Sequence, residues 1–185
     1  MKKILALVMA FAAITSATQL QAQSDKPFSF GFGFEGGPVV GDKGMKEGFG
    51  FQGGLNLRFS VKAGPGYITF TPGGMVVIPK KIDEDVKVGT SIPLKLGYKY
   101  NFASKFFVMA EGGYSIYSFY AASIDEETDY ENIRSSKYST GGFTWAPTIG
   151  VDLGKLELGL RYESTLLKKE KSTISLASLR VGFNF

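Results

Sequence analysis

The amino-acid sequence predicts an all-β fold, an eight-stranded antiparallel up-and-down transmembrane β-barrel. Three observations support this prediction. Eight segments carry apolar side chains at every second position, the period of a strand with one face in lipid. Long and short connections between these segments alternate along the chain. The last segment, 177–185, places Leu179, Val181, Phe183 and Phe185 on one face and ends on an aromatic residue.

The first two strands are predicted at 27–36 and 49–61, with a Gly-rich polar loop over 36–48 between them. The heptapeptide Gly-Phe-Gly-Phe-Glu-Gly-Gly at 31–37 recurs at 48–54 with Gln in place of Glu. Gly-rich segments also form phosphate-binding loops, but such loops need a strand–loop–helix context, and no helical period follows here. We therefore interpret these glycines as residues of barrel strands, where they allow bending and leave room inside.

Strands three and four are predicted at 66–79 and 86–101, with a charged loop over 80–85 between them. Alternation is poor in strand three, which contains Pro72-Gly73-Gly74. Because proline cannot donate a backbone hydrogen bond and glycine often marks an irregular strand, this tripeptide predicts a bulge or bend. Strand four alternates cleanly between apolar and polar residues.

The second half of the chain continues the same pattern after a tight turn at 101–105. Each further strand again has one apolar and one polar face, and the connections again differ in length. The remaining predicted strands are 105–120, 138–153, 155–164 and 177–185, with connections at 121–137, 154–155 and 166–171.

The connection lengths also predict an orientation. If both chain ends lie in the periplasm, every long connection faces outward from the cell and every short one faces the periplasm. This is the usual arrangement of outer-membrane barrels. A soluble β-sandwich, the alternative that fits the last strand equally well, gives no reason for connections to alternate. We therefore expect the barrel.

Residues 1–22 are expected to form a cleavable secretory signal peptide, which leaves the barrel domain at 23–185. Lys2 and Lys3 precede an apolar run over 4–14, and small and polar residues follow as far as Ala22. The run is too short to cross a bilayer as a helix. A signal peptide followed by a barrel predicts localisation in the outer membrane.

The composition argues against several classes of function. The chain has no Cys, so it can form neither a disulfide framework nor a diacylated lipoprotein anchor. Loss of Lys2 and Lys3 leaves 19 basic residues against 17 acidic ones, so the basic isoelectric point gives no reason to expect nucleic acid. We expect no cofactor.

The chain also contains no His, the side chain that most often shuttles protons near neutral pH. We therefore do not expect an enzyme. A paired-carboxylate site at Glu35 or Glu111 stays conceivable, but no spacing singles one out. The acidic segment 125–131 could bind Ca²⁺, because hard cations prefer clustered oxygens. It lacks the Gly and the regular spacing of an EF-hand, so a solvated charge run is the alternative.

Several short motifs stand out along the predicted strands. They are Ser-Ile-Pro-Leu-Lys-Leu-Gly-Tyr-Lys-Tyr-Asn-Phe at 91–102, Lys-Phe-Phe-Val-Met-Ala-Glu-Gly-Gly-Tyr at 105–114, Arg161-Tyr162 after Leu158, Phe-Gln-Gly-Gly-Leu-Asn-Leu at 51–57, and the C-terminal 181–185. Together these motifs resemble the PorT-like outer-membrane β-barrel family, the small "porin family" barrels of Bacteroidetes type. The resemblance implies a fold and a compartment, but no activity, because the family is functionally mixed. Its members are often named porins or secretion-associated proteins.

In a closed barrel the apolar faces should meet lipid and the polar faces should meet one another inside. In strand six the lipid-facing set would include Leu153. Five acids and five bases fall on the inward face, and an eight-stranded barrel is only wide enough for side chains. We expect a structural ion-paired network among Glu35, Arg58, Lys95, Lys99, Glu111, Asp152, Glu157, Arg161, Glu163 and Arg180, which leaves the lumen mostly plugged.

Three functions remain open at this stage. The first is a structural or surface-interaction protein whose outward loops, chiefly 121–137, contact a protein partner or lipopolysaccharide. The second is a narrow pore for small solutes, and the third is an accessory of an envelope secretion system. The expected partners are outer-membrane lipids and the outer-membrane assembly machinery. The terminal residues Leu179, Val181, Phe183 and Phe185 resemble the signal that this machinery reads.

Overall fold

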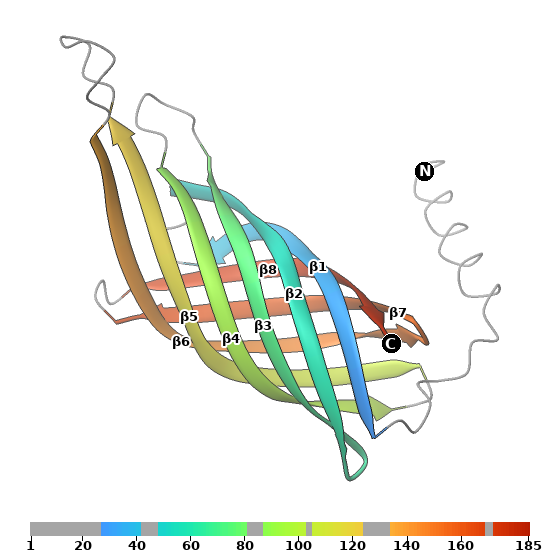
Figure 1. Cartoon of the computed structure of the whole chain (residues 1–185). Helices are drawn as coiled ribbons and strands as arrows, with labels where there is room; N and C mark the ends of the chain where they lie inside the picture. Colours follow the sequence, from blue (N-terminus) through green and yellow to red (C-terminus); the bar gives the residue numbers. More distant parts are fainter. Residues whose placement is uncertain (1–26, 42–47, 81–86, 103–104, 124–133, 169–171) are drawn as a thin grey trace, which may run out of the picture.

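The computed structural model describes residues 27–41, 48–80, 87–102, 105–123, 134–168 and 172–185. Each strand pairs antiparallel with the next, and the last pairs with the first to close the barrel (Figure 1). The predicted eight-stranded up-and-down fold is confirmed. The expected signal peptide and the acidic segment 125–131 lie largely outside these residues. The strands are β1 (Phe28–Gly41), β2 (Phe49–Ala63), β3 (Gly66–Pro79), β4 (Lys87–Phe102), β5 (Phe106–Ser123), β6 (Arg134–Leu153), β7 (Leu156–Leu167) and β8 (Thr173–Asn184).

The two faces of the wall differ sharply in chemistry. Along β4, Ile92, Leu94 and Leu96 point outward and are exposed, whereas Ser91 and Lys95 point inward and are buried. The outer face is apolar because it meets lipid, while closure of the sheet gives the backbone its hydrogen-bond partners. Among the described residues, no helix is long and apolar enough to cross a membrane.

Several strands extend further than predicted at the end of the long connections, which we call the long-loop end. β5 and β6 continue to pair where a loop was predicted over 121–137, with Ala121 opposite Ser136. Figure 1 shows these two strands reaching beyond the rest of the barrel. β1 likewise continues to Gly41 because its last residues pair with β8, and β7 continues to Leu167. Outside the lipid region a strand need not alternate apolar and polar residues, so the sequence pattern does not reveal these extensions.

Of the bulge or bend predicted at Pro72-Gly73-Gly74, the bulge is wrong. β3 keeps one register with β2 from Phe51 to Ala63 and one register with β4 throughout, so no residue is inserted at the proline. The irregularity in the β2–β3 ladder lies instead between Phe49 and Phe51. The proline leaves a gap in pairing rather than a shift, because it lacks a donor but still fits an extended strand.

The assignment of Leu153 to the lipid face is also wrong, because Leu153 is buried. In β3, where the sequence pattern was poor, Tyr67, Met75 and Val77 point inward and are buried. Apolar residues therefore share the inward face with polar ones. At the long-loop end they form an apolar plug, defined by Val39, Val77, Tyr117, Leu167 and Ile174 with Phe49 and Phe119 packed against it.

The opposite end carries the tight turns and the chain's last residue, and we call it the short-turn end (Figure 1). β6 and β7 are joined there by Gly154 and Lys155. Gly154 has φ of 81°, a left-handed conformation that suits two-residue hairpins. The Asp152 carboxylate accepts a hydrogen bond from the Gly154 backbone N–H at 3.3 Å, which ties the turn to the barrel interior.

Candidate functional site

Ten charged side chains occupy inward positions of seven strands and form what we call the ionic cluster. β7 supplies three of them because its inward positions alternate with leucine and tyrosine on the lipid face. Each of the ten side chains is at most 4% exposed. The members are Glu35 on β1, Arg58 on β2, Lys95 and Lys99 on β4, Glu111 on β5, Asp152 on β6, Glu157, Arg161 and Glu163 on β7, and Arg180 on β8.

Glu157 is the centre of the layer nearest the short-turn end. Its Oε1 atom accepts from Arg58 Nη1 at 2.6 Å and also from Arg180 Nη1. Its Oε2 atom accepts from Lys99 Nζ at 2.7 Å. Lys99 Nζ also reaches Asp152 Oδ2 at 2.8 Å. Three cations and two anions from five strands therefore meet in one layer.

Arg161 is the centre of the middle layer. Its Nη1 atom lies 2.9 Å from Glu35 Oε2, its Nη2 atom pairs with Glu111, and its Nε donates to Thr148 Oγ1 at 3.0 Å. Glu35 and Glu111, the two carboxylates considered as a catalytic pair, thus share one guanidinium. Since each is held by a buried cation, neither is positioned as a free acid or base.

Amide and hydroxyl groups add further hydrogen bonds to these two layers. Asn56 donates to Glu35 Oε2 at 3.1 Å and accepts from Arg180 Nη2 at 3.0 Å, so it links the middle layer to the Glu157 layer. Thr71 donates to Glu111 Oε1 at 2.6 Å. Charges buried at this density are tolerated only when partners surround them in this way.

Above the middle layer the interior becomes less charged toward the long-loop end. Lys95 pairs with Glu163, the last ion pair in this direction. Thr144 then bonds both Ser115 Oγ and Thr165 Oγ1 at 2.7 Å. The apolar plug follows. The order along the barrel is therefore ion pairs, hydroxyl groups and apolar side chains.

The sequence pointed to the ionic cluster but missed the apolar plug. Tyr117 and Leu167 are 1% and 3% exposed and stand at inward positions of β5 and β7. Continuing the alternation of each strand past its predicted apolar stripe would have placed both inside. Among the described residues, no group of three or more acidic, His or Cys side chains could hold a metal ion.

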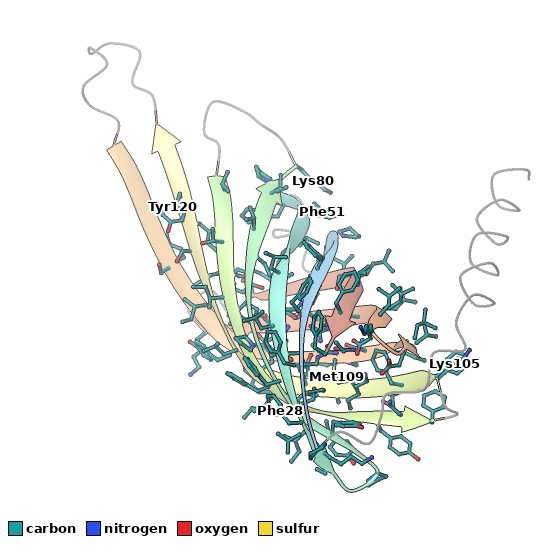
Figure 2. The ribbon with its side chains drawn as sticks, turned by 45° about the vertical axis from the view of Figure 1, so that its right-hand side comes forward. Phe28, Phe51, Lys80, Lys105, Met109 and Tyr120 are labelled. Carbon is teal, nitrogen blue, oxygen red and sulfur yellow. The ribbon has the colours of Figure 1, made fainter. Side chains whose placement is uncertain are left out.

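The residues that resemble an assembly signal lie on the outer face of β8 and at its end. They are Leu179, Val181, Phe183 and Phe185. Leu179 and Phe185 are 65% and 59% exposed. Phe185 N donates to Phe30 O at 2.7 Å, and Phe30 N donates to Phe185 O at 3.3 Å, so the last residue helps close the sheet. Its ring stacks on Phe32, with centroids 6.1 Å apart. Figure 2 shows the side chains along the wall, with Lys105 and Phe28 toward the short-turn end and Tyr120 toward the other.

A family model described as "Outer membrane protein beta-barrel domain" matches residues 4–185. The chain belongs to this family. As a member of the outer membrane protein β-barrel family, it is an outer-membrane β-barrel protein. Comparison with curated protein sequences gave no match.

Several solved structures of outer-membrane barrels share the fold. Ail, the attachment invasion locus protein of Yersinia pestis, aligns with a TM-score of 0.62 and 11% identity over 85% of this chain and 97% of Ail. Neisserial surface protein A aligns with a TM-score of 0.56 and 13% identity over 86% and 98% of the two chains. The N-terminal barrel domain of Pseudomonas aeruginosa OprF aligns with a TM-score of 0.54 and 12% identity over 85% and 97%. Identities this low establish a common fold alone.

Proposed function

We propose that the protein is a surface-interaction barrel with a closed lumen, and that the β5–β6 hairpin is its main contact element. The single observation behind the proposal is strand length. β5 and β6 have 18 and 20 residues, whereas about 9–11 residues suffice for a tilted strand to cross a bilayer. The surplus lies at the long-loop end, so these two strands project from the membrane together.

The outer face of the hairpin supports this proposal. Ile116 and Phe143 are exposed apolar residues of β5 and β6, as a lipid-facing wall requires. Further toward the tip, Ser118 Oγ and Ser139 Oγ lie 3.0 Å apart. The change from apolar to hydroxyl side chains marks the level at which the strands leave the hydrocarbon.

The expected partners follow from this arrangement. Lys80 and Lys168 are exposed at the long-loop end, where cations would attract the phosphate groups of lipopolysaccharide. A protein partner would bind the projecting segment around 121–137. Outer-membrane lipids would cover the wall, and the assembly machinery would recognise the strand that ends at Phe185. We also propose that residues 1–22 act as a cleavable signal peptide for export. Within the family, we propose that the chain belongs with the PorT-like members.

Surface exposure of the hairpin can be tested in intact cells. Added protease should cut within the segment between Ala121 and Ser136 and leave the rest of the barrel protected. As a control, the tight turn at Gly154–Lys155 should resist cleavage until the outer membrane is permeabilised. Cleavage at that turn in intact cells, with the hairpin intact, would reverse the orientation and contradict the proposal.

The closed lumen is tested by conductance. Ion pairs, hydroxyl groups and the apolar plug occupy successive levels of the interior, so the purified protein should give no steady conductance in planar bilayers. A narrow pore for small solutes is the alternative, and steady current would establish it. A role as accessory of a secretion system rests on the family resemblance alone, and stable co-purification with an envelope complex would support it.

A further inference from the structure

We infer that the outer wall binds one anionic glycerophospholipid, with an acyl chain in an apolar groove across β4–β8 and its head group at Lys105. The groove has a volume of about 1090 Å³ and lies on the lipid-facing side. It crosses the strands along the direction of their hydrogen bonds. This site is independent of the hairpin and of the lumen.

Small or flat side chains form the floor of the groove. In the ladders, Tyr98 stands opposite Ala110, Ala110 opposite Pro147, and Tyr162 opposite Ala177. Pro147 and Tyr162 face each other where the β6–β7 pairing is interrupted between Trp145 and Thr148. Prolines and alanines project little from the wall, so this row lies lower than its neighbours.

A row of large side chains forms one wall. Val108 stands opposite Ile149, Ile149 opposite Leu160, and Leu160 opposite Leu179. Leu160 and Leu179 are 61% and 65% exposed, among the most exposed apolar side chains of the described barrel. On the other side, just outside the lining of the groove, Trp145 is the next outward residue of β6, and its ring centroid lies 5.5 Å from that of Tyr162. The β6 part of the floor is thus bordered on both sides.

An acyl chain is the occupant that suits this groove. It lies on the surface that the family assignment places in the outer membrane, and its lining is almost wholly apolar. In lipid there is no hydrophobic drive between apolar surfaces, so affinity comes from van der Waals contact. A chain lying between Trp145 and the Leu160–Leu179 row contacts protein on three sides, whereas a chain on a smooth wall contacts it on one.

The charge at one end of the groove selects an anionic head group. The groove ends at Tyr98 and Tyr100, close to the short-turn end, and Tyr98 Oη donates to Ala63 O at 2.9 Å. Tyrosine side chains favour this interfacial level of a membrane. Lys105 and Lys155 are exposed in the adjacent turns. Lysines at a membrane surface attract anionic lipids.

The test uses Trp145, the chain's one tryptophan, as the reporter. In bilayers of unlabelled phosphatidylcholine, phosphatidylglycerol with brominated chains is titrated in and quenching of Trp145 is recorded. A bound lipid should give half-maximal quenching at a mole fraction about fivefold lower than brominated phosphatidylcholine does, the factor that one lysine contributes. Lipids that merely surround the barrel would quench in proportion to mole fraction, whatever their charge.

Three variants separate the groove from the general wall. Ala177→Leu fills the floor beside Tyr162 and should abolish the preference for phosphatidylglycerol. Lys105→Gln should reduce it about fivefold. Val76→Leu, at an exposed lipid-facing position of β3 outside the groove, should leave it unchanged. Heat-modifiable migration in gels verifies that each variant is folded.

Three outcomes would overturn the inference. Equal quenching by both brominated lipids in the unaltered protein would show that the wall has no preference for an anionic lipid. If folded Ala177→Leu kept an undiminished preference for phosphatidylglycerol, the groove would not be the binding site. Displacement of the brominated lipid by lipopolysaccharide but not by unlabelled phosphatidylglycerol would replace the proposed ligand with another lipid class.

Discussion

At the scale of single residues, Glu157 carries the greatest electrostatic burden. One carboxylate accepts from Arg58, Lys99 and Arg180 while it is almost fully removed from solvent. Removing one member of a buried ionic group is far more damaging than its net contribution suggests, since the remaining charges lose their compensation. Removal of Glu157 should therefore destabilise the barrel more than removal of one of its three cationic partners.

We predict that Glu157→Gln lowers the free energy of unfolding by about 3–5 kcal/mol. Arg58, Lys99 and Arg180 would then face Asp152 as the nearest remaining anion of their layer. Arg58→Met should be milder, because Glu157 keeps its bonds to Lys99 and Arg180. Urea unfolding in lipid vesicles, with the exposed Lys155→Gln as control, measures both. Equal destabilisation by the two cluster variants would contradict this account.

Alternation placed the ten charged residues inside, but it could not pair them. Glu35 and Arg161 are 126 positions apart and meet only because closure of the barrel leaves β8 alone between β1 and β7. Partner choice depends on the stagger of all eight strands, which no local pattern encodes. For the same reason the sequence could not show that Glu111 shares Arg161 with Glu35.

At the scale of elements, close contact between strands depends on glycine at particular positions. A Cβ atom at Gly142 of β6 would lie 1.7 Å from the Leu166 carbonyl oxygen of β7. At Gly112 of β5, the nearest atom to such a Cβ would be 3.7 Å away on Phe143. The two glycines are therefore similar in sequence context and opposite in steric constraint.

We predict that Gly142→Ala destabilises the barrel by about 1–3 kcal/mol, the usual effect of forcing an extra methyl into a packed site. Gly112→Ala should be neutral or slightly stabilising, because alanine restricts the unfolded chain and meets no obstacle here. Urea midpoints in vesicles compare the two directly. A larger loss at Gly112 than at Gly142 would refute the steric explanation.

We also predict that deletion of Phe185 impairs assembly in the outer membrane and leaves export to the periplasm intact. The deletion removes two backbone hydrogen bonds to Phe30 as well as the terminal aromatic ring. Cell fractionation and heat-modifiable migration measure the result, and substitution by Tyr should restore assembly because it keeps the ring. Normal barrel formation without Phe185 would count against this prediction.

Strand number and strand faces were readable from the sequence, while strand ends and irregularities were not. β3 begins and ends where alternation and flanking turns placed it, at Gly66 and Pro79. β6 begins at Arg134 rather than 138, because beyond the lipid a strand needs a partner but no apolar face. The bulge considered at Pro72 is absent because an extended strand tolerates proline when the register continues past the few pairings that are lost in each ladder.

At the scale of the whole molecule, side chains of different chemistry occupy successive levels of the lumen. The ionic cluster fills the half nearer the short-turn end, and the apolar plug fills the long-loop end. Opening one level should therefore leave the others shut. This arrangement is consistent with a barrel whose work is done on its outer surfaces.

We predict that Tyr117→Ala destabilises the protein by about 3–5 kcal/mol without producing conductance. The substitution leaves a cavity in the plug, but Lys95, Glu163 and the layers below still block the path. Planar-bilayer recording and urea unfolding of the same preparation test both parts. Steady current through folded Tyr117→Ala would show that the plug alone closes the lumen.

The position of β7 has a consequence for the order of events during biogenesis. Glu157, Arg161 and Glu163 together take part in every interior ion pair described above except Lys99–Asp152. The cations and acids of β1, β2, β4 and β5 therefore lack these ion-pair partners until β7, near the C-terminal end of the chain, joins the sheet. Until it arrives, a sheet released into the bilayer would carry uncompensated charges. The buried charges thus make release of an incomplete barrel into the bilayer unfavourable, and they favour release only after all strands have joined.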